Sequence, residues 1–139
     1  MIILDTSGLL AAIDGSQRRH GAAVAVLRGA PGPLLLSPFV LAELDHLLST
    51  RVSTAAADAL LGQVADGAYR LEPMGAEDVA RGREVIERYR DLGLGLADAS
   101  LVVLADRHDA TDVLTLDERH FRAIVGPRGR PFRLLPADA

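Results

Sequence analysis

Four acidic residues stand within or directly after apolar segments, where a soluble protein seldom places a carboxylate. They are Asp5, Glu43, Asp98 and Asp117. Asp5, for example, ends the apolar run 1–4, and Asp98 lies inside the mostly apolar segment 94–104. Carboxylates are rarely buried unless they are paired or bound to a metal ion. Together the four residues predict an acidic pocket that a hard cation neutralises.

An all-carboxylate site suits Mg²⁺ or Mn²⁺ and does not suit zinc. In phosphodiester hydrolysis such metals activate the attacking water and stabilise the leaving oxygen, so that no protein nucleophile is needed. This chemistry fits a chain that has no Cys and shows no evident Ser-His-Asp arrangement. The residue types therefore favour metal-dependent hydrolysis of a phosphodiester.

A structural alternative stands beside this interpretation for each acid. Asp5, Asp98 and Asp117 each precede or open a predicted helix, where Asp is a good N-cap. Glu43 borders the apolar face of its predicted helix and can extend to water. A cap uses only one lone pair of a carboxylate, so a cap and a metal ligand are compatible roles. Asp112, before a predicted strand, is expected to be a solvated strand-end residue.

Short apolar runs alternate with helical patterns along the chain, which predicts an α/β fold with a parallel sheet covered on both faces. Ligands of such folds bind beyond the carboxyl ends of the strands, where Asp5 and Asp117 fall. The acids are 38, 55 and 19 residues apart, so only a tertiary site can join them. Strands are expected at 1–4, 34–36, 69–71, 112–116 and 132–135, and helices at 8–13, 18–27, 38–48, 53–64, 76–90 and 96–106, with a helical turn at 118–121.

Length and composition agree with one domain over residues 1–139. No apolar stretch reaches the roughly 18 residues of a membrane span, and the N-terminus lacks the basic region of a signal peptide, so we expect no membrane association and a cytoplasmic protein. The net charge is -4, and all 15 basic residues are Arg. On charge alone this is an unpromising nucleic-acid binder, although two bound Mg²⁺ ions would add about four positive charges locally.

Several other classes are excluded by absent residues. The chain has neither a Walker loop ending in Lys-Ser/Thr nor a GxGxxG dinucleotide fingerprint. Response-regulator receivers also carry an Asp after the first strand, but they use a Lys, which this chain lacks. Dehalogenase-type phosphatases require a second Asp two residues after the first, and that position is Ser7.

The four acids lie in motifs that resemble those of PIN domains, specifically the VapC-type toxins of bacterial toxin–antitoxin pairs. The motifs are Ile3-Leu4-Asp5-Thr6-Ser7-Gly8-Leu9-Leu10, Leu41-Ala42-Glu43-Leu44, Leu96-Ala97-Asp98-Ala99 and Leu114-Thr115-Leu116-Asp117-Glu118-Arg119-His120-Phe121. The resemblance covers nearly the whole chain. It implies a PIN-like three-layer α/β/α domain and an endoribonuclease that depends on Mg²⁺ or Mn²⁺. Carried over by position, the four acids are the catalytic and metal-binding residues, with Thr6 and Thr115 as polar supports.

The resemblance also implies partners. Such toxins pair with a small VapB-like antitoxin, whose Arg often reaches the carboxylates, and they commonly form homodimers. The substrate would be RNA, by analogy a tRNA anticodon loop or a ribosomal RNA loop. Arg119 and Arg122 are candidate phosphate contacts, and Arg128, Arg130 and Arg133 extend this basic segment; the alternative for all of them is a solvated surface. The four histidines are expected to be surface residues, although His120 adjoins Asp117.

Two further hypotheses stay open. One is a PIN-type nuclease with a housekeeping role in RNA maturation or decay. The other is a non-catalytic α/β module whose acids only cap helices.

Overall fold

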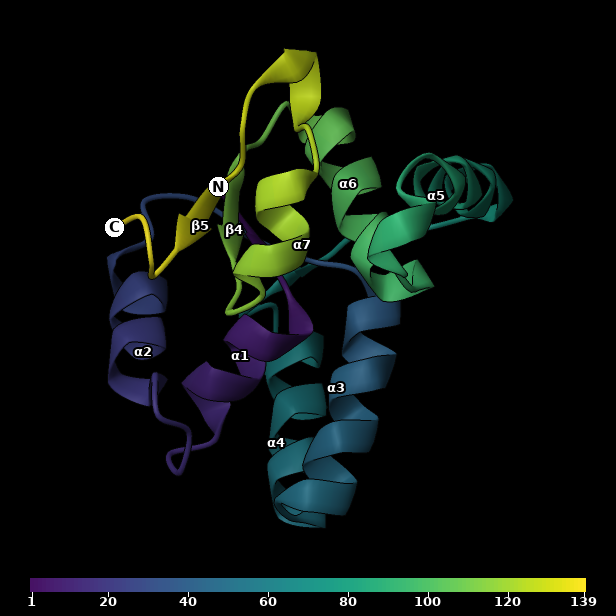
Figure 1. Ribbon diagram of the computed structural model, residues 1–139. Helices are drawn as coiled ribbons and strands as arrows, with labels where there is room; N and C mark the ends of the chain where they lie inside the picture. Colours follow the sequence, from purple (N-terminus) through teal and green to yellow (C-terminus); the bar gives the residue numbers. More distant parts are fainter.

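Five short parallel strands form the centre of the computed structural model, which describes residues 1–139 (Figure 1). The strands are β1 (Ile2–Leu4), β2 (Leu34–Leu36), β3 (Arg70–Leu71), β4 (Asp112–Leu114) and β5 (Arg133–Leu135). They lie in the order β3-β2-β1-β4-β5. From β1 the chain builds outward through β2 and β3, then returns to place β4 on the other side of β1. Strand order therefore reverses between β1 and β4, the position at which parallel α/β sheets bind ligands.

Both faces of the sheet are covered. Neighbouring residues of a strand point to opposite faces, and in β1 both Ile3 and Leu4 are completely buried. Val113 and Leu114 of β4 are buried in the same way. Helices therefore pack on each side, which confirms the predicted three-layer α/β/α arrangement.

Seven α-helices and two 3₁₀-helices surround the sheet. They are α1 (Thr6–Ile13), α2 (His20–Gly29), α3 (Pro38–Arg51), α4 (Thr54–Ala65), α5 (Ala76–Arg88), α6 (Leu96–His108) and α7 (Glu118–Ala123), with η1 (Arg90–Leu92) and η2 (Pro127–Gly129). All the expected elements are present, and their ends differ from the expected ones by a few residues. None of the helices combines the length and the apolar character needed to cross a bilayer.

The helices that carry Glu43 and Asp98 are joined at the end of β2. Ser37 precedes Pro38, and its Oγ accepts a hydrogen bond from the backbone N–H of Phe39 at 3.2 Å, which caps α3. The same hydroxyl is hydrogen-bonded to Ser100 Oγ of α6 at 2.7 Å, in a fully buried contact. This contact fixes the start of α3 against the first turns of α6.

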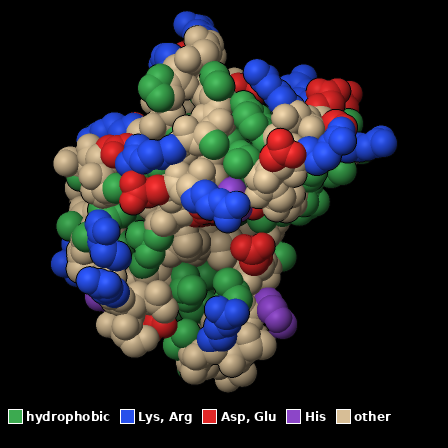
Figure 2. All heavy atoms as spheres, viewed as in Figure 1, with side chains coloured by type: hydrophobic (Ala, Val, Ile, Leu, Met, Phe, Trp, Pro, Cys, Tyr) green, Lys and Arg blue, Asp and Glu red, His purple; other side chains and the backbone are tan.

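Helix α5 lies at the periphery beside α6, as Figure 1 shows. Its outer surface carries a dense mixture of basic and acidic side chains, seen at the upper right of Figure 2. Only Gly82 of this helix is buried, and there a Cβ would come 3.4 Å from Leu96 Cδ1 of α6. An added Cβ would thus make ordinary van der Waals contact with α6, and Gly82 marks the line along which the two helices pack.

Helix α1 packs directly on the backbone of β4. A Cβ added at Gly8 would lie 2.3 Å from the carbonyl oxygen of Leu114 and 2.5 Å from its carbonyl carbon. Real side chains do not tolerate such distances, and a backbone obstacle cannot rotate away. Gly8 therefore sets how closely the first turn of α1, with the adjacent Asp5, approaches the end of β4.

We expect Gly8→Ala to destabilise the protein by about 1–3 kcal/mol, since the added methyl overpacks a backbone contact. Chemical denaturation would measure this change. Gly62→Ala is the matched control, because Gly62 lies within α4 with no atom within 4 Å of an added Cβ. The control should gain roughly 0.5–1 kcal/mol from helix propensity alone. Equal responses of the two variants would contradict the proposed close approach.

Candidate active site

The four acids expected from the sequence line one pocket of about 300 Å³. Each comes from a different part of the fold: the residue after β1, the middle of α3, the first turn of α6 and the start of α7. The pocket lies beyond the carboxyl ends of β1 and β4, where strand order reverses. Its lining residues are Asp5, Thr6, Ser7, Leu10, Glu43, Leu47, Arg51, Asp98 and Asp117.

Asp5 is the buried member of the set, with 4% of its surface exposed. Its backbone N–H donates to Leu114 O at 3.0 Å and so extends the β1–β4 pairing by one residue. Its Oδ2 accepts hydrogen bonds from Thr115 Oγ1 at 2.6 Å and Ser7 Oγ at 2.9 Å. Although Asp5 occupies the N-cap position of α1, its side chain makes no capping hydrogen bond. Capping therefore does not account for this carboxylate.

Asp98 and Asp117 do make local helix contacts, each through one carboxylate oxygen. Helix α6 begins at Leu96, so Asp98 is its third residue, and Asp98 Oδ2 accepts from the Gly95 N–H at 3.2 Å. Asp117 caps α7, with Oδ1 accepting from the His120 N–H at 3.0 Å. Both residues are half-buried at the pocket. Capping and a ligand role thus remain compatible at these two positions.

Glu43 is the most exposed of the four acids. It projects from the middle of α3 into the pocket wall, and no hydrogen bond or ion pair holds its carboxylate. Burial thus declines from Asp5, through Asp98 and Asp117, to Glu43.

Burial and mutual repulsion raise the pKa values of two of the acids. Burial raises the pKa of Asp5 from 3.8 to about 6, against the opposing hydrogen bonds from Thr115 and Ser7, and the charge of Asp98 adds to the increase. Burial also raises the pKa of Asp98, assisted by the charges of Asp117 and Glu43 and opposed by the Gly95 N–H and His120. The pocket therefore holds an excess of negative charge, and a bound cation would reduce the repulsion between its carboxylates.

The donor chemistry fits Mg²⁺ or Mn²⁺. The acidic side chains of the pocket offer carboxylate oxygens as metal ligands. The hydroxyl of Thr6, which lines the same pocket, is buried without a hydrogen-bond partner. No three acidic or histidine side chains converge as a complete ligand set. Mg²⁺ does not require such a set, because it commonly keeps several waters and takes only one or two protein carboxylates.

Two polar residues beside the acids have roles that the sequence analysis did not assign. Ser7 donates to Asp5 and accepts from the Leu116 N–H at 3.0 Å, so it ties the two strand ends together. Its position two residues after Asp5 is the signal that could have identified it. His120 Nδ1 lies 2.6 Å from Asp117 Oδ2, without the angle of a hydrogen bond, and the contact is an ion pair only when the imidazole is protonated. His120 therefore belongs to the surroundings of the pocket and is not a freely solvated residue.

The candidate phosphate-binding arginines divide into two groups. Arg119 is exposed and forms no ion pair. Arg122 is held by Glu118 at 2.7 Å and by Asp138 at 2.8 Å, which braces α7 against the C-terminal segment. Neither residue lines the pocket. The remaining arginines of this segment are also paired: Arg128 and Arg130 with Asp109, and Arg133 with Asp112.

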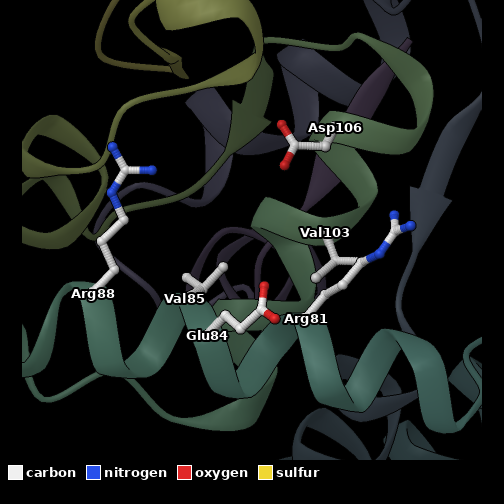
Figure 3. A pocket seen from close by; sticks show the side chains of 6 residues that line it. All are labelled: Arg81, Glu84, Val85, Arg88, Val103 and Asp106. Carbon is white, nitrogen blue, oxygen red and sulfur yellow. The ribbon is translucent and has the colours of Figure 1, made fainter.

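A second hollow, of about 380 Å³, lies between α5 and α6 (Figure 3). Arg81, Glu84, Val85 and Arg88 line it from α5, and Val103 and Asp106 line it from α6. Its two basic and two acidic residues balance each other. This hollow therefore concentrates neither a cation nor an anion, in contrast to the acidic pocket.

Comparison with known proteins agrees with this geometry. The PIN domain family model matches residues 2–126. The chain belongs to the PIN-domain family. Over 135 residues this PIN domain is 40% identical to ribonuclease VapC26 of Mycobacterium tuberculosis, covering 97% of this chain and 100% of that protein. The predicted resemblance to VapC-type proteins is thereby confirmed.

Solved structures share the fold of this PIN domain. VapC20 of Mycobacterium tuberculosis, a toxin that cleaves the sarcin–ricin loop, superposes with a TM-score of 0.79 at 24% identity, covering 84% of this chain and 90% of its own. VapBC2 of Rickettsia felis, bound to a promoter DNA fragment, superposes with a TM-score of 0.67 at 18% identity. The match covers 96% of this chain and 98% of the Rickettsia chain. FitAcB of Neisseria gonorrhoeae superposes with a TM-score of 0.62 at 21% identity. The match covers 85% of this chain and 88% of the Neisseria chain.

The raised pKa of Asp5 gives a prediction about pH and stability. Between pH 3.8 and about 6 the folded PIN domain retains a proton on Asp5 that the unfolded chain has lost, so the free energy of unfolding falls as pH rises through this range. Asp5→Asn removes the titration while keeping a hydrogen-bond acceptor. In EDTA we expect the variant to match the unsubstituted protein near pH 4 and to exceed its stability by about 3 kcal/mol above pH 6.

Denaturant unfolding of both proteins across this pH range would measure the difference. Added Mg²⁺ should reduce it, because a ligand that binds only the folded state stabilises that state. A stability difference that does not change with pH would contradict a charged, desolvated Asp5.

Proposed function

We propose that this PIN domain is an endoribonuclease that depends on Mg²⁺ or Mn²⁺ and acts as the toxin of a type II toxin–antitoxin pair. The observation that carries the proposal is the meeting of four carboxylates, from four separate elements, around one pocket at the strand ends. Kinship with a VapC ribonuclease supports the choice of RNA as the substrate.

In this proposal Asp5, Glu43, Asp98 and Asp117 are the catalytic residues that hold the metal. When bound, a divalent metal lowers the pKa of water and stabilises charge that develops on a phosphodiester. The chain itself supplies the orientation of the carboxylates. Thr115 and Ser7 fix one oxygen of Asp5, and the Gly95 N–H fixes one oxygen of Asp98. Asp117 is restrained by the first turn of α7.

We propose an RNA loop, in tRNA or ribosomal RNA, as the target. The toxin VapC20, which shares this fold, cleaves the sarcin–ricin loop. Aromatic residues make up only 4% of the chain, which argues against a surface for stacking successive bases. Recognition through RNA shape and Arg–phosphate contacts is the alternative that remains.

A small VapB-like antitoxin and a second copy of the chain are the partners that we propose. The Rickettsia and Neisseria relatives of this fold are toxin–antitoxin assemblies, which supports the antitoxin. An Arg from the antitoxin would supply the positive charge that the pocket lacks, since a guanidinium and a carboxylate pair through two parallel hydrogen bonds. A housekeeping nuclease would use the same pocket and would differ in having no such partner.

Asp98→Asn tests the proposed chemistry. We expect it to lower the rate of cleavage of total small RNA by on the order of a hundredfold or more, because it removes a negative charge that holds the metal. The assay uses antitoxin-free protein with Mg²⁺ or Mn²⁺, and EDTA should abolish the discrete fragments. Asp58→Asn is the matched control, since Asp58 is exposed on α4 and forms no ion pair.

The same variant separates the proposal from a purely structural role of the acids. If Asp98 only stabilised the start of α6, its replacement would change stability by around 1 kcal/mol and leave cleavage unaltered. A folded Asp98→Asn protein that cleaves RNA as fast as Asp58→Asn would refute the proposed catalytic role.

A further inference from the structure

Arg51 is the one basic residue that lines the acidic pocket. It is exposed, ends α3, and forms neither an ion pair nor a side-chain hydrogen bond with the rest of the chain. Six of the 15 arginines are paired with carboxylates: Arg90, Arg107, Arg122, Arg128, Arg130 and Arg133. Arg51 thus lines the same pocket as the four acids, and none of them binds its guanidinium.

The helical register explains this separation. Glu43, Leu47 and Arg51 are four residues apart, so they lie along one face of α3. Eight residues of helix place the Cα of Arg51 about 12 Å along the axis from that of Glu43. Because helical side chains tilt toward the helix N-terminus, Arg51 can extend its guanidinium back along α3 toward the acids. Leu47 and Leu10, from α1, form the apolar wall in between.

An RNA strand in this pocket meets a specific electrostatic problem. Four carboxylates repel phosphate, and a cation held by them compensates only the phosphate that it contacts. Figure 2 shows basic and acidic side chains interspersed over the viewed face of the protein, and within the pocket itself Arg51 is the one basic lining residue. A neighbouring phosphate therefore requires its own cation from the protein. The planar fork of Arg suits a phosphate, with two parallel hydrogen bonds.

We propose that Arg51 binds a phosphate of the substrate RNA adjacent to the one that is cleaved. The intervening nucleotide lies over Leu10 and Leu47, so the strand follows the axis of α3 from the acids to the end of the helix. This inference rests on the proposed ribonuclease function. It assigns substrate positioning to a residue outside the set of acids and outside the C-terminal basic segment.

Binding of a fluorescein-labelled RNA hairpin tests the proposal. The protein carries Asp98→Asn, so that the probe stays intact, and binding is measured over a series of NaCl concentrations. Arg51→Gln should weaken binding by about tenfold and lower the magnitude of the slope of log K against log salt by about 0.7, the loss of one single-strand phosphate contact. Arg51→Lys should keep the slope, because the charge remains, and lose part of the affinity.

Arg28→Gln is the matched control. Arg28 is also exposed in the last turn of its helix, so both substitutions remove the same favourable interaction with a helix terminus. Without the Asp98 substitution, Arg51→Gln should raise the KM for RNA cleavage and leave kcat nearly unchanged, as expected for a contact made equally in the bound and transition states. Its unfolding free energy should change no more than that of Arg28→Gln.

The contrary results separate the two proposals. If the unsubstituted protein cleaves RNA but Arg51→Gln binds the hairpin as tightly as Arg28→Gln does, the role of Arg51 alone is overturned. Unsubstituted protein that neither binds the hairpin nor cleaves any RNA would overturn the ribonuclease proposal and the role of Arg51 with it. Unchanged RNA binding with weakened antitoxin binding would overturn the inference by assigning Arg51 to a protein partner.

Discussion

The pairing of β1 with β4 brings together the two strand ends around which the acidic pocket forms. Ile3 and Leu4 lie in register with Val113 and Leu114, and the Asp5 N–H continues this ladder to Leu114 O. Because parallel strands end at the same edge, the residues that follow them, Asp5 and Thr115, meet there and share a hydrogen bond of 2.6 Å. One backbone pairing thus fixes a carboxylate and its hydroxyl donor although they are 110 residues apart.

The second constraint is the free energy of placing negative charge at this edge. Burial of Asp5 opposes its ionisation, and the nearby acids repel one another. Hydrogen bonds from Thr115, Ser7 and Gly95 compensate only part of this cost. A bound cation would offset this cost, so the proposed metal binding and the stability of the folded chain depend on the same residues.

The sequence was sufficient for the architecture and for the identity of the acids that line the pocket. Alternation of apolar runs and helical patterns predicts the parallel sheet, and strand-end positions bring Asp5 and Asp117 to one edge. Side-chain partners were harder to predict, because they depend on tertiary distances. The contact of Arg122 with Asp138 spans 16 residues through a turn and a strand, and that of Ser7 with the Leu116 N–H spans 109. Arg51 reaches the pocket only because α3 continues three residues beyond its expected end at Leu48.

The brace between Arg122 and Asp138 has a consequence for how the pocket holds its shape. Helix α7 has six residues, too few to persist by its own hydrogen bonding. Asp138 also accepts the Leu134 N–H at 2.8 Å, so its carboxylate ties α7 to β5 at the edge of the sheet. The carboxylate of Asp117, at the first turn of α7, is therefore oriented in part by a contact at the other end of that helix. The shape of the acidic pocket thus depends on two residues that do not line it, and an exchange at one of them is expected to favour a compensating exchange at the other.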